Sequence, residues 1–256
     1  MQNLTVAVVQ QEIVPNNPQL NLSTFSRAIS HLDNCDLIVL PEVFTTGFCA
    51  NARSFAELVD GTAYTWMAEH AKQLNAVVTG SLVVKEGDTY FNRMVWMRPD
   101  GSYTHYDKRH LFRMGGEHTR YQSGTERLIV ELNGWRILPL VCYDLRFPVW
   151  SRNRNDYDLS LYVANWPSAR ALHWNRLLQA RAIENQSYVV GVNRVGMDEV
   201  HQHYSGDSAI YGPAGEVIVH SQETGSFFAE LYGDKLLEYR EKFPAYMDAD
   251  EFELKV

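Results

Sequence analysis

Three residues that could take part in acyl transfer each follow directly after a strand-like run. Glu42 follows "LIVLP", Lys108 follows "YTHYD", and Cys142 follows "ILPLV". In α/β sheets, ligands bind beyond the carboxyl ends of strands, so we expect these three side chains to converge. Taken singly, each has a plainer explanation: a solvated carboxylate, a surface lysine and a buried cysteine.

A thiol, a carboxylate and an ammonium together suit acyl transfer from an amide, an ester or a nitrile. The thiolate is the nucleophile, and a free cysteine is mostly protonated at neutral pH. We expect the ammonium of Lys108 to favour the thiolate of Cys142 and the carboxylate of Glu42 to take the proton. The backbone amide of Tyr143 follows the nucleophile and would hold the oxyanion together with Lys108.

The composition is that of a globular protein and narrows the range of partners. The chain has 256 residues, 45% of them hydrophobic, and a formal net charge of −8. Nucleic acid is not an expected partner, because phosphate binding needs clustered positive charge. The N-terminus lacks a signal-peptide pattern, and no apolar run approaches the roughly 18 residues that span a membrane. We therefore expect no membrane association.

The three cysteines, Cys35, Cys49 and Cys142, are widely spaced and form no CxxC motif. Such a pattern argues against a disulfide framework and favours a reducing cytoplasm. Cys35 and Cys49 match no motif and are interpreted as packing residues. The pair His201 and His203 lacks a carboxylate or cysteine ligand set around it, so we predict no metal site and no cofactor.

Apolar periodicity predicts alternating strands and helices early in the chain and hairpins later. Helices are expected at 18–32, 61–75, 171–187 and 233–241. Strands are expected at 4–10, 35–42, 76–84, 89–98, 102–108, 127–132, 136–142, 158–166, 187–195 and 226–232, with a further hairpin over 205–221. No break divides the series, which predicts one α/β domain over 1–256 with mixed sheets covered by helices.

Several motifs resemble those of the nitrilase superfamily of carbon–nitrogen hydrolases. They are "LPE" at 40–42, "YDKRHLF" at 106–112 and "VCYDLRFP" at 141–148, followed by "ANWP" at 164–167, "ARAIEN" at 180–185 and "GDSAI" at 206–210. The resemblance covers nearly the whole chain. It implies a four-layer α-β-β-α sandwich in which Glu42 is general base and acid, Lys108 stabilises the oxyanion, and Cys142 is the nucleophile.

The resemblance also implies a second active-site glutamate and a homodimer. "RMGGEHTRY" places the glutamate at Glu117, the alternative being an exposed loop carboxylate. The dimer contact would use the segment 147–153 and the helix at 171–187, with Trp150 and Trp174 as anchors. Arg181 and Glu184, three residues apart on that helix, are interpreted as an ion pair rather than as catalytic groups.

"CYDLRFP" with "NRVG" looks most like the omega-amidase branch, which implies 2-oxoglutaramate as substrate and 2-oxosuccinamate second. Arg146, four residues after the nucleophile, could bind the substrate carboxylate with two parallel hydrogen bonds; alternatively it pairs with Asp144 or Asp156. Trp166 either lines the pocket or packs. Two other functions stay open: a carbon–nitrogen hydrolase acting on a nitrile or an N-carbamoyl amine, and a non-catalytic binding protein.

Overall fold

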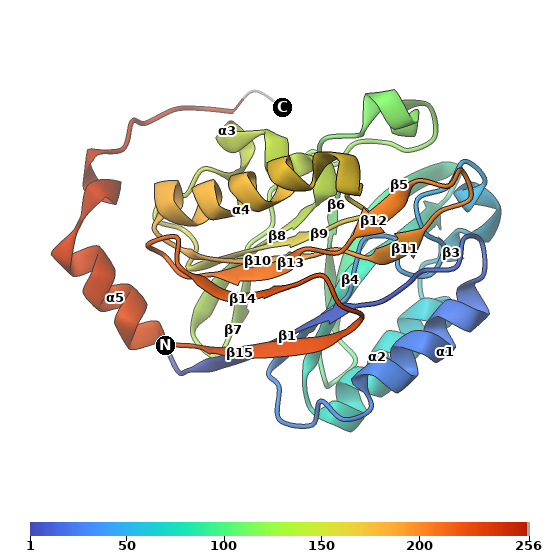
Figure 1. The fold of residues 1–256 in the computed structure, drawn as a ribbon, viewed down its shortest axis with the longest axis horizontal. Helices are drawn as coiled ribbons and strands as arrows, with labels where there is room; N and C mark the ends of the chain where they lie inside the picture. The colour runs from blue at the N-terminus through green and yellow to red at the C-terminus, as the bar shows by residue number, and fades with distance from the viewer. Residues whose placement is uncertain (255–256) are drawn as a thin grey trace.

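The computed structural model describes residues 1–254, and its centre is a pair of β-sheets packed face to face (Figure 1). The seven-stranded first sheet has the order β15-β1-β2-β4-β5-β6, with β3 pairing β4. Its strands are β1 Leu4–Gln10, β2 Leu37–Val39, β3 Glu57–Leu58, β4 Val77–Glu86, β5 Thr89–Met97, β6 Tyr103–Asp107 and β15 Gly225–Leu231.

The six-stranded second sheet has the order β14-β13-β10-β9-β8-β7. Its strands are β7 Val130–Leu132, β8 Trp135–Val141, β9 Leu159–Val163, β10 Tyr188–Val192, β13 Ser208–Tyr211 and β14 Val217–Ser221. A separate hairpin joins β11 Val195–Met197 to β12 His203–Ser205.

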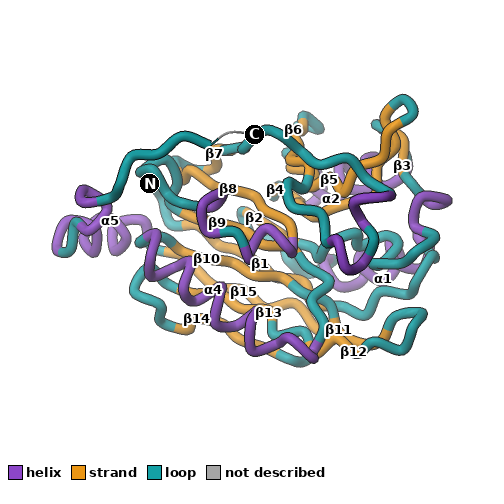
Figure 2. The backbone as a smooth tube through the Cα atoms, turned by 90° about the horizontal axis from the view of Figure 1, so that it is seen from above, coloured by secondary structure: helices purple, strands orange, loops and turns teal. Residues whose placement is uncertain are grey.

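Helices cover both outer faces of the sheet pair, as Figures 1 and 2 show. The helices are α1 Pro18–Ile29, α2 Thr62–Leu74, α3 Pro148–Ser151, α4 Ala171–Asn185 and α5 Gly233–Lys242. α1 and α2 lie against the first sheet, and α4 lies against the second. The predicted four-layer α-β-β-α sandwich is therefore confirmed.

The strand sequences are continuous apolar runs because both faces of each sheet are covered. In β1, Leu4, Val6 and Val8 belong to the core between the sheets. Ala7 and Val9 point the other way, toward α1 and α2. Successive side chains of a strand alternate between faces, so one seven-residue run contributes to two cores.

Because neighbouring strands are parallel, the loops that follow several of them begin at the same end of the sandwich. β1, β2 and β4 are parallel to one another, and so are β8, β9 and β10. The chain leaves β2 toward Glu42, β8 toward Cys142 and β9 toward Asn165. Residues 187–195, predicted as one strand, instead divide at Asn193, whose side chain bonds to Trp166 and Gly206 and diverts the chain into β11.

Among residues 1–254, no helix has the length and apolar character needed to cross the bilayer.

Candidate active site

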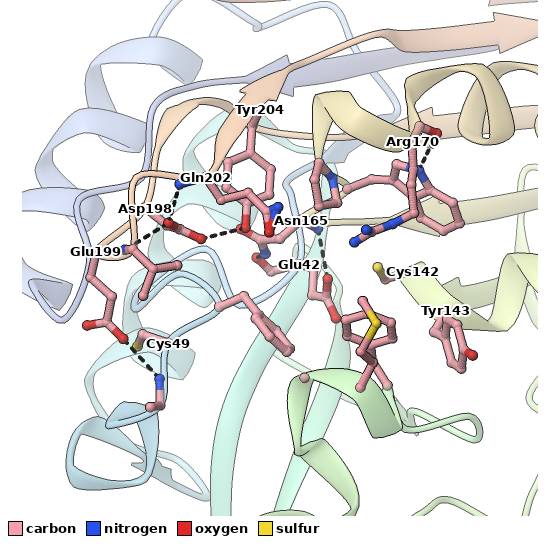
Figure 3. A pocket seen from close by; sticks show the side chains of 18 of the residues that line it. Glu42, Cys49, Cys142, Tyr143, Asn165, Arg170, Asp198, Glu199, Gln202 and Tyr204 are labelled. Carbon is pink, nitrogen blue, oxygen red and sulfur yellow. Dashed lines mark hydrogen bonds between the residues drawn. The ribbon is translucent and has the colours of Figure 1, made fainter.

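Cys142 lies at the sharp turn where β8 ends and a 3₁₀ helix, Cys142–Arg146, begins. Its φ angle is +46°, in the left-handed region that residues with a Cβ seldom adopt. The turn brings Cys142 to the wall of a cavity of about 290 Å³ (Figure 3). The polypeptide therefore holds an unfavourable backbone conformation in order to present this side chain to a pocket.

Glu42 faces the same cavity and is held by the loop that follows β9. The backbone N–H of Asn165 donates to Oε2 of Glu42 at 2.8 Å, and Nδ2 of Asn165 donates to the Glu42 carbonyl at 2.6 Å. The next residue, Val43, has a φ angle of +40°, and its N–H donates to Oγ of Ser81 at 2.8 Å. These bonds fix the direction of the Glu42 carboxylate.

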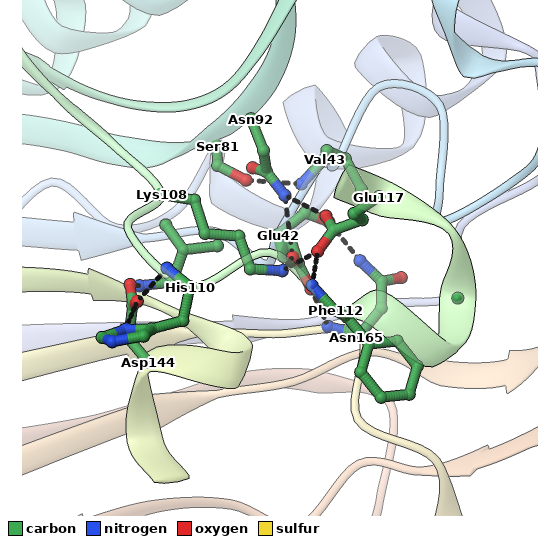
Figure 4. Close-up of polar contacts among 12 residues, drawn as sticks. Glu42, Val43, Ser81, Asn92, Lys108, His110, Phe112, Glu117, Asp144 and Asn165 are labelled. Carbon is green, nitrogen blue, oxygen red and sulfur yellow. Dashed lines mark hydrogen bonds and ion pairs between the residues drawn. The ribbon is translucent and has the colours of Figure 1, made fainter. Parts of the chain in front are cut away.

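Lys108 sits between two buried carboxylates, as Figure 4 shows. Its Nζ is 2.8 Å from Oε1 of Glu42 and 2.8 Å from Oε2 of Glu117. Nδ2 of Asn92 donates to both glutamates, at 2.8 Å to Glu42 and 3.3 Å to Glu117. Burial alone would lower the pKa of Lys108, but Glu117 and Glu42 raise that pKa well above its usual value. The lysine therefore stays an ammonium.

Glu117 is fully buried, so the alternative of an exposed loop glutamate is wrong. It opens a 3₁₀ helix, Glu117–Thr119, in the loop after β6. Besides Lys108, the N–H of Phe112 donates to its Oε2 at 2.6 Å. The loop thus folds inward around this carboxylate.

Lys108 favours the thiolate of Cys142, as expected, but burial and the charge of Glu42 outweigh its effect on the pKa of this thiol. Burial and the charge of Glu42 raise the pKa of Cys142 well above the ordinary value of 9.0, and Lys108 offsets this only in part. The ammonium of Lys108 pairs with two carboxylates, and both of these raise the pKa of the Cys142 thiol. A carboxylate base is accordingly needed during attack, and Glu42 borders the same cavity as the thiol.

Tyr143, Arg146 and Trp166 all line this cavity. The guanidinium carbon of Arg146 lies 4.7 Å from the centre of the Trp166 ring, and Nη2 of Arg146 is 3.1 Å from Nδ1 of His173. Neither proposed partner of Arg146 is free: Asp144 bonds to Tyr106 and His110, and Asp156 bonds to Arg127. Trp166 both packs and lines the pocket, since it is only 3% exposed.

Comparisons of the whole chain with known proteins agree with this arrangement of residues around the pocket. The model of the carbon–nitrogen hydrolase family matches residues 5–231. This chain belongs to the carbon–nitrogen hydrolase family. Omega-amidase YafV of Escherichia coli K12 is 51% identical over 256 residues, covering 99% of this chain and 100% of that protein. The 2-oxoglutaramate amidase of Bacillus subtilis is 33% identical, covering 95% of this chain and 96% of that protein.

A solved structure shows the same architecture. XC1258 from Xanthomonas campestris, described as a CN-hydrolase superfamily protein with an arsenic adduct in its active site, superposes with a TM-score of 0.98. It is 44% identical, and each chain covers 100% of the other. An amidase from Nesterenkonia sp., at 22% identity and a TM-score of 0.82, shares the fold over 95% of this chain.

Three polar residues in or beside this site were assigned no role from the sequence: Asn92, Asn165 and Arg170. Asn165 belongs to the motif "ANWP" and lies two residues beyond the end of β9. Asn92 lies within β5, where no motif marks it. Arg170 also lines the pocket, on the side of Cys142 and Tyr143, whereas Asp198 and Glu199 lie across from them (Figure 3).

Other predictions for single residues have mixed outcomes. Arg181 and Glu184 do form an ion pair, at 2.7 Å. Cys35 packs in the core beneath α1 and α2, but Cys49 also borders the pocket. Within the described residues there is no group of three or more side chains suited to hold a metal ion.

Trp150 and Trp174 cannot anchor a dimer in the way predicted. They are 5% and 0% exposed within this single chain, and Nε1 of Trp174 donates to the carbonyl of Asp207. The sequence showed that large aromatics occur in these segments but not which face of the helix they occupy. The exposed apolar side chains of these two helices are instead Val149 on α3 and Leu172 and Ile183 on α4.

Proposed function

We propose that this protein is an omega-amidase, which hydrolyses the terminal amide of 2-oxo dicarboxylic acid monoamides. The preferred substrate would be 2-oxoglutaramate, followed by 2-oxosuccinamate. One observation carries the proposal: Arg146 and Arg170 line the pocket of Cys142, and neither forms an ion pair with any carboxylate in the described part of the chain. The names of the relatives at 51% and 33% identity support the same substrate class.

The reaction would begin with proton transfer from the Cys142 thiol to Glu42. The thiolate attacks the amide carbon, and the oxyanion is held by the Lys108 ammonium and the Tyr143 N–H. A donor of this kind contributes on the order of 3 kcal/mol to transition-state stability. Glu42 then gives its proton to the departing ammonia, which leaves a thioester on Cys142.

Hydrolysis of the thioester would use the same carboxylate a second time. Glu42 removes a proton from water, and the resulting hydroxide attacks the thioester carbon. The 2-oxo diacid leaves, and the proton held by Glu42 returns to the sulfur. No cofactor or metal takes part in this proposal.

Arg146 would set the direction in which the substrate binds. The substrate carries a carboxylate at the end opposite its scissile amide, and a guanidinium can bind it through two parallel hydrogen bonds. The cation–π contact with Trp166 helps to hold the Arg146 guanidinium at the pocket wall. Arg170, from the turn after Trp166, adds a second positive charge to the same wall.

A substrate panel separates this proposal from its rivals. Ammonia release would be measured with 2-oxoglutaramate, 2-oxosuccinamate, hexanamide, a nitrile and an N-carbamoyl amine. We expect the first two to be preferred in kcat/KM. Preference for the nitrile or the carbamoyl compound would identify a different carbon–nitrogen hydrolase, and no turnover of any compound would favour a binding protein.

We also propose a cytoplasmic homodimer that binds neither nucleic acid nor membrane. The exposed Val149, Leu172 and Ile183 give the face of α3 and α4 an apolar character that suits a subunit contact. A reducing compartment would keep the nucleophilic thiol free. Light scattering at micromolar concentration tests the assembly: twice the chain mass is expected, and a monomeric mass would refute the dimer.

A further inference from the structure

Asp144 is a buried carboxylate that the proposed mechanism does not use. It is 0% exposed and accepts four hydrogen bonds. Oδ2 accepts from the N–H of Val141 at 3.0 Å and from the hydroxyl of Tyr106 at 2.8 Å. Oδ1 accepts from the N–H of His110 at 2.9 Å and from its ring Nδ1 at 2.8 Å (Figure 4). Buried polar atoms in proteins nearly always have hydrogen-bond partners, and here each carboxylate oxygen of Asp144 accepts two hydrogen bonds.

Two of these bonds bear on the nucleophile and its turn. Asp144 comes two residues after Cys142, and Val141 comes directly before it. The bond from the Val141 N–H to Asp144 therefore closes a loop around Cys142. Since Cys142 has a φ angle of +46°, which costs free energy in a residue with a Cβ, this bond opposes relaxation of the turn.

The other bonds bear on Lys108. Tyr106 and His110 lie two residues before and two residues after the lysine, and both donate to Asp144. These donors are themselves held by their surroundings. Nε1 of Trp150 donates to the Tyr106 hydroxyl at 3.0 Å, and the His110 ring stacks on Phe147 with 3.9 Å between ring centres.

We infer that Asp144 is a positioning residue that fixes the Cys142 turn and the Lys108 segment relative to each other. One carboxylate is bonded to the chain on both sides of the lysine and across the nucleophile turn. Loss of this link would let the Cys142 sulfur and the Lys108 ammonium move apart, while the other residues that line the pocket stay in place. The kinetic part of the inference rests on the proposed function, whereas its conformational part does not.

Asp144→Asn tests the inference because it keeps the shape and turns one acceptor into a donor. That donor would face the N–H of Val141 if it replaces Oδ2, or the N–H of His110 if it replaces Oδ1. Misplacement of a reacting group by about 1 Å costs roughly 100-fold in rate. We expect kcat to fall by about that factor, with KM for 2-oxoglutaramate changed less than about threefold, at a temperature where the variant is folded.

Asp158→Asn is the matched control. Asp158 is 3% exposed and accepts from Arg136 and Arg240, but it precedes β9 at the end opposite Asn165. We expect this control to lose stability and keep its kcat when folded. Equal kcat values for the folded Asp144→Asn variant and the wild type would overturn the inference, as would an equal loss of kcat in the control.

A second experiment needs no substrate and therefore separates this inference from the proposed function. Glycine adopts a positive φ freely, so Cys142→Gly removes the strain that Asp144 is inferred to hold. Denaturant unfolding of the wild type, both single variants and the double variant forms a thermodynamic cycle. We expect Asp144→Asn to lower the denaturation midpoint less in the glycine background; an equal shift in both backgrounds would contradict the role at the turn.

Should Asp144→Asn not fold, Tyr106→Phe replaces it. This variant removes one donor to Asp144 and keeps the ring in place. We expect kcat to fall by about tenfold with KM nearly unchanged, because one of the links to the Lys108 segment is lost. Unchanged kcat would count against the inference.

Discussion

The ammonium nitrogen of Lys108 lies 2.8 Å from a carboxylate oxygen of Glu42, and both side chains are 1% exposed. A buried ion pair gives little net stability, since desolvation cancels much of the attraction. Here the pair joins the proposed oxyanion donor to the proposed base. Its value therefore lies in holding two reacting groups at a fixed separation.

Replacing Lys108 with glutamine is expected to reduce both turnover and stability. The variant leaves Glu42 and Glu117 buried without their shared cation, and removing one partner of a buried pair costs about 3–5 kcal/mol. The two carboxylates would also repel each other, which adds to the loss of stability. Denaturant unfolding of the variant and the wild type measures this loss. Near-normal turnover would remove Lys108 from the site.

Glu117→Gln tests the second glutamate. Glutamine keeps one oxygen that can accept from Lys108 and from the Phe112 N–H, but it carries no charge, so the ammonium loses one of its two counter-charges. We expect kcat/KM to fall by about 100-fold or more. Glu126→Gln, an exposed carboxylate in the same region, is the control and should leave kcat/KM unchanged. A mild effect of Glu117→Gln would point to another carboxylate.

Glu42→Gln is expected to make the Cys142 thiol more reactive toward an alkylating reagent and, at the same time, to abolish amide turnover. The charge of Glu42 raises the pKa of Cys142, so its removal should lower that pKa. Iodoacetamide should then label Cys142 at lower pH than in the wild type, while amide turnover is abolished because the base is gone.

Cys35 and Cys49 serve as internal references, since burial raises the pKa of each thiol to about 11. Mass spectrometry of the labelled peptides over a range of pH should show Cys142 labelled at lower pH in the Glu42→Gln variant, while labelling of the two reference thiols is unchanged. Slower labelling of Cys142 in the Glu42→Gln variant would contradict the assigned electrostatics.

Arg146→Met is expected to change substrate preference rather than general activity. The substrate carboxylate would lose its partner, which should cost about 2–4 kcal/mol in kcat/KM for 2-oxoglutaramate. Hexanamide, which has no carboxylate, should lose little. Arg176→Met, an exposed arginine on α4, is the control for loss of positive charge. An equal loss on both substrates would mean that Arg146 has a structural role.

Much of the layered fold could be predicted from the sequence because each strand is a local apolar run. β1 and α1 begin where expected, although α1 ends at Ile29 rather than at 32. The hairpin of β11 and β12 was missed, since Asn193 diverts the chain through bonds to residues distant in sequence. Local patterns carry no signal of that kind.

Some residues of the candidate site could likewise be predicted from the sequence, and others could not. Glu42, Lys108 and Cys142 follow strands and belong to motifs, so sequence alone could indicate them. Asn92 contacts two glutamates that are 50 and 25 residues away, and only the folded chain brings them together. The direction of the Cys142 pKa shift was likewise beyond the sequence, because it depends first on how deeply the folded chain buries the thiol, and then on the charges of Glu42, Lys108 and Glu117 around it.

The most direct measurement is ammonia release from 2-oxoglutaramate by the wild-type protein and by Cys142→Ala at equal concentration. Binding of 2-oxoglutarate to the variant, followed by calorimetry, shows that the pocket is intact. The account predicts stoichiometric ammonia and 2-oxoglutarate from the wild type and none above background from the variant. Undiminished turnover by Cys142→Ala, or no turnover by the wild type, would contradict it.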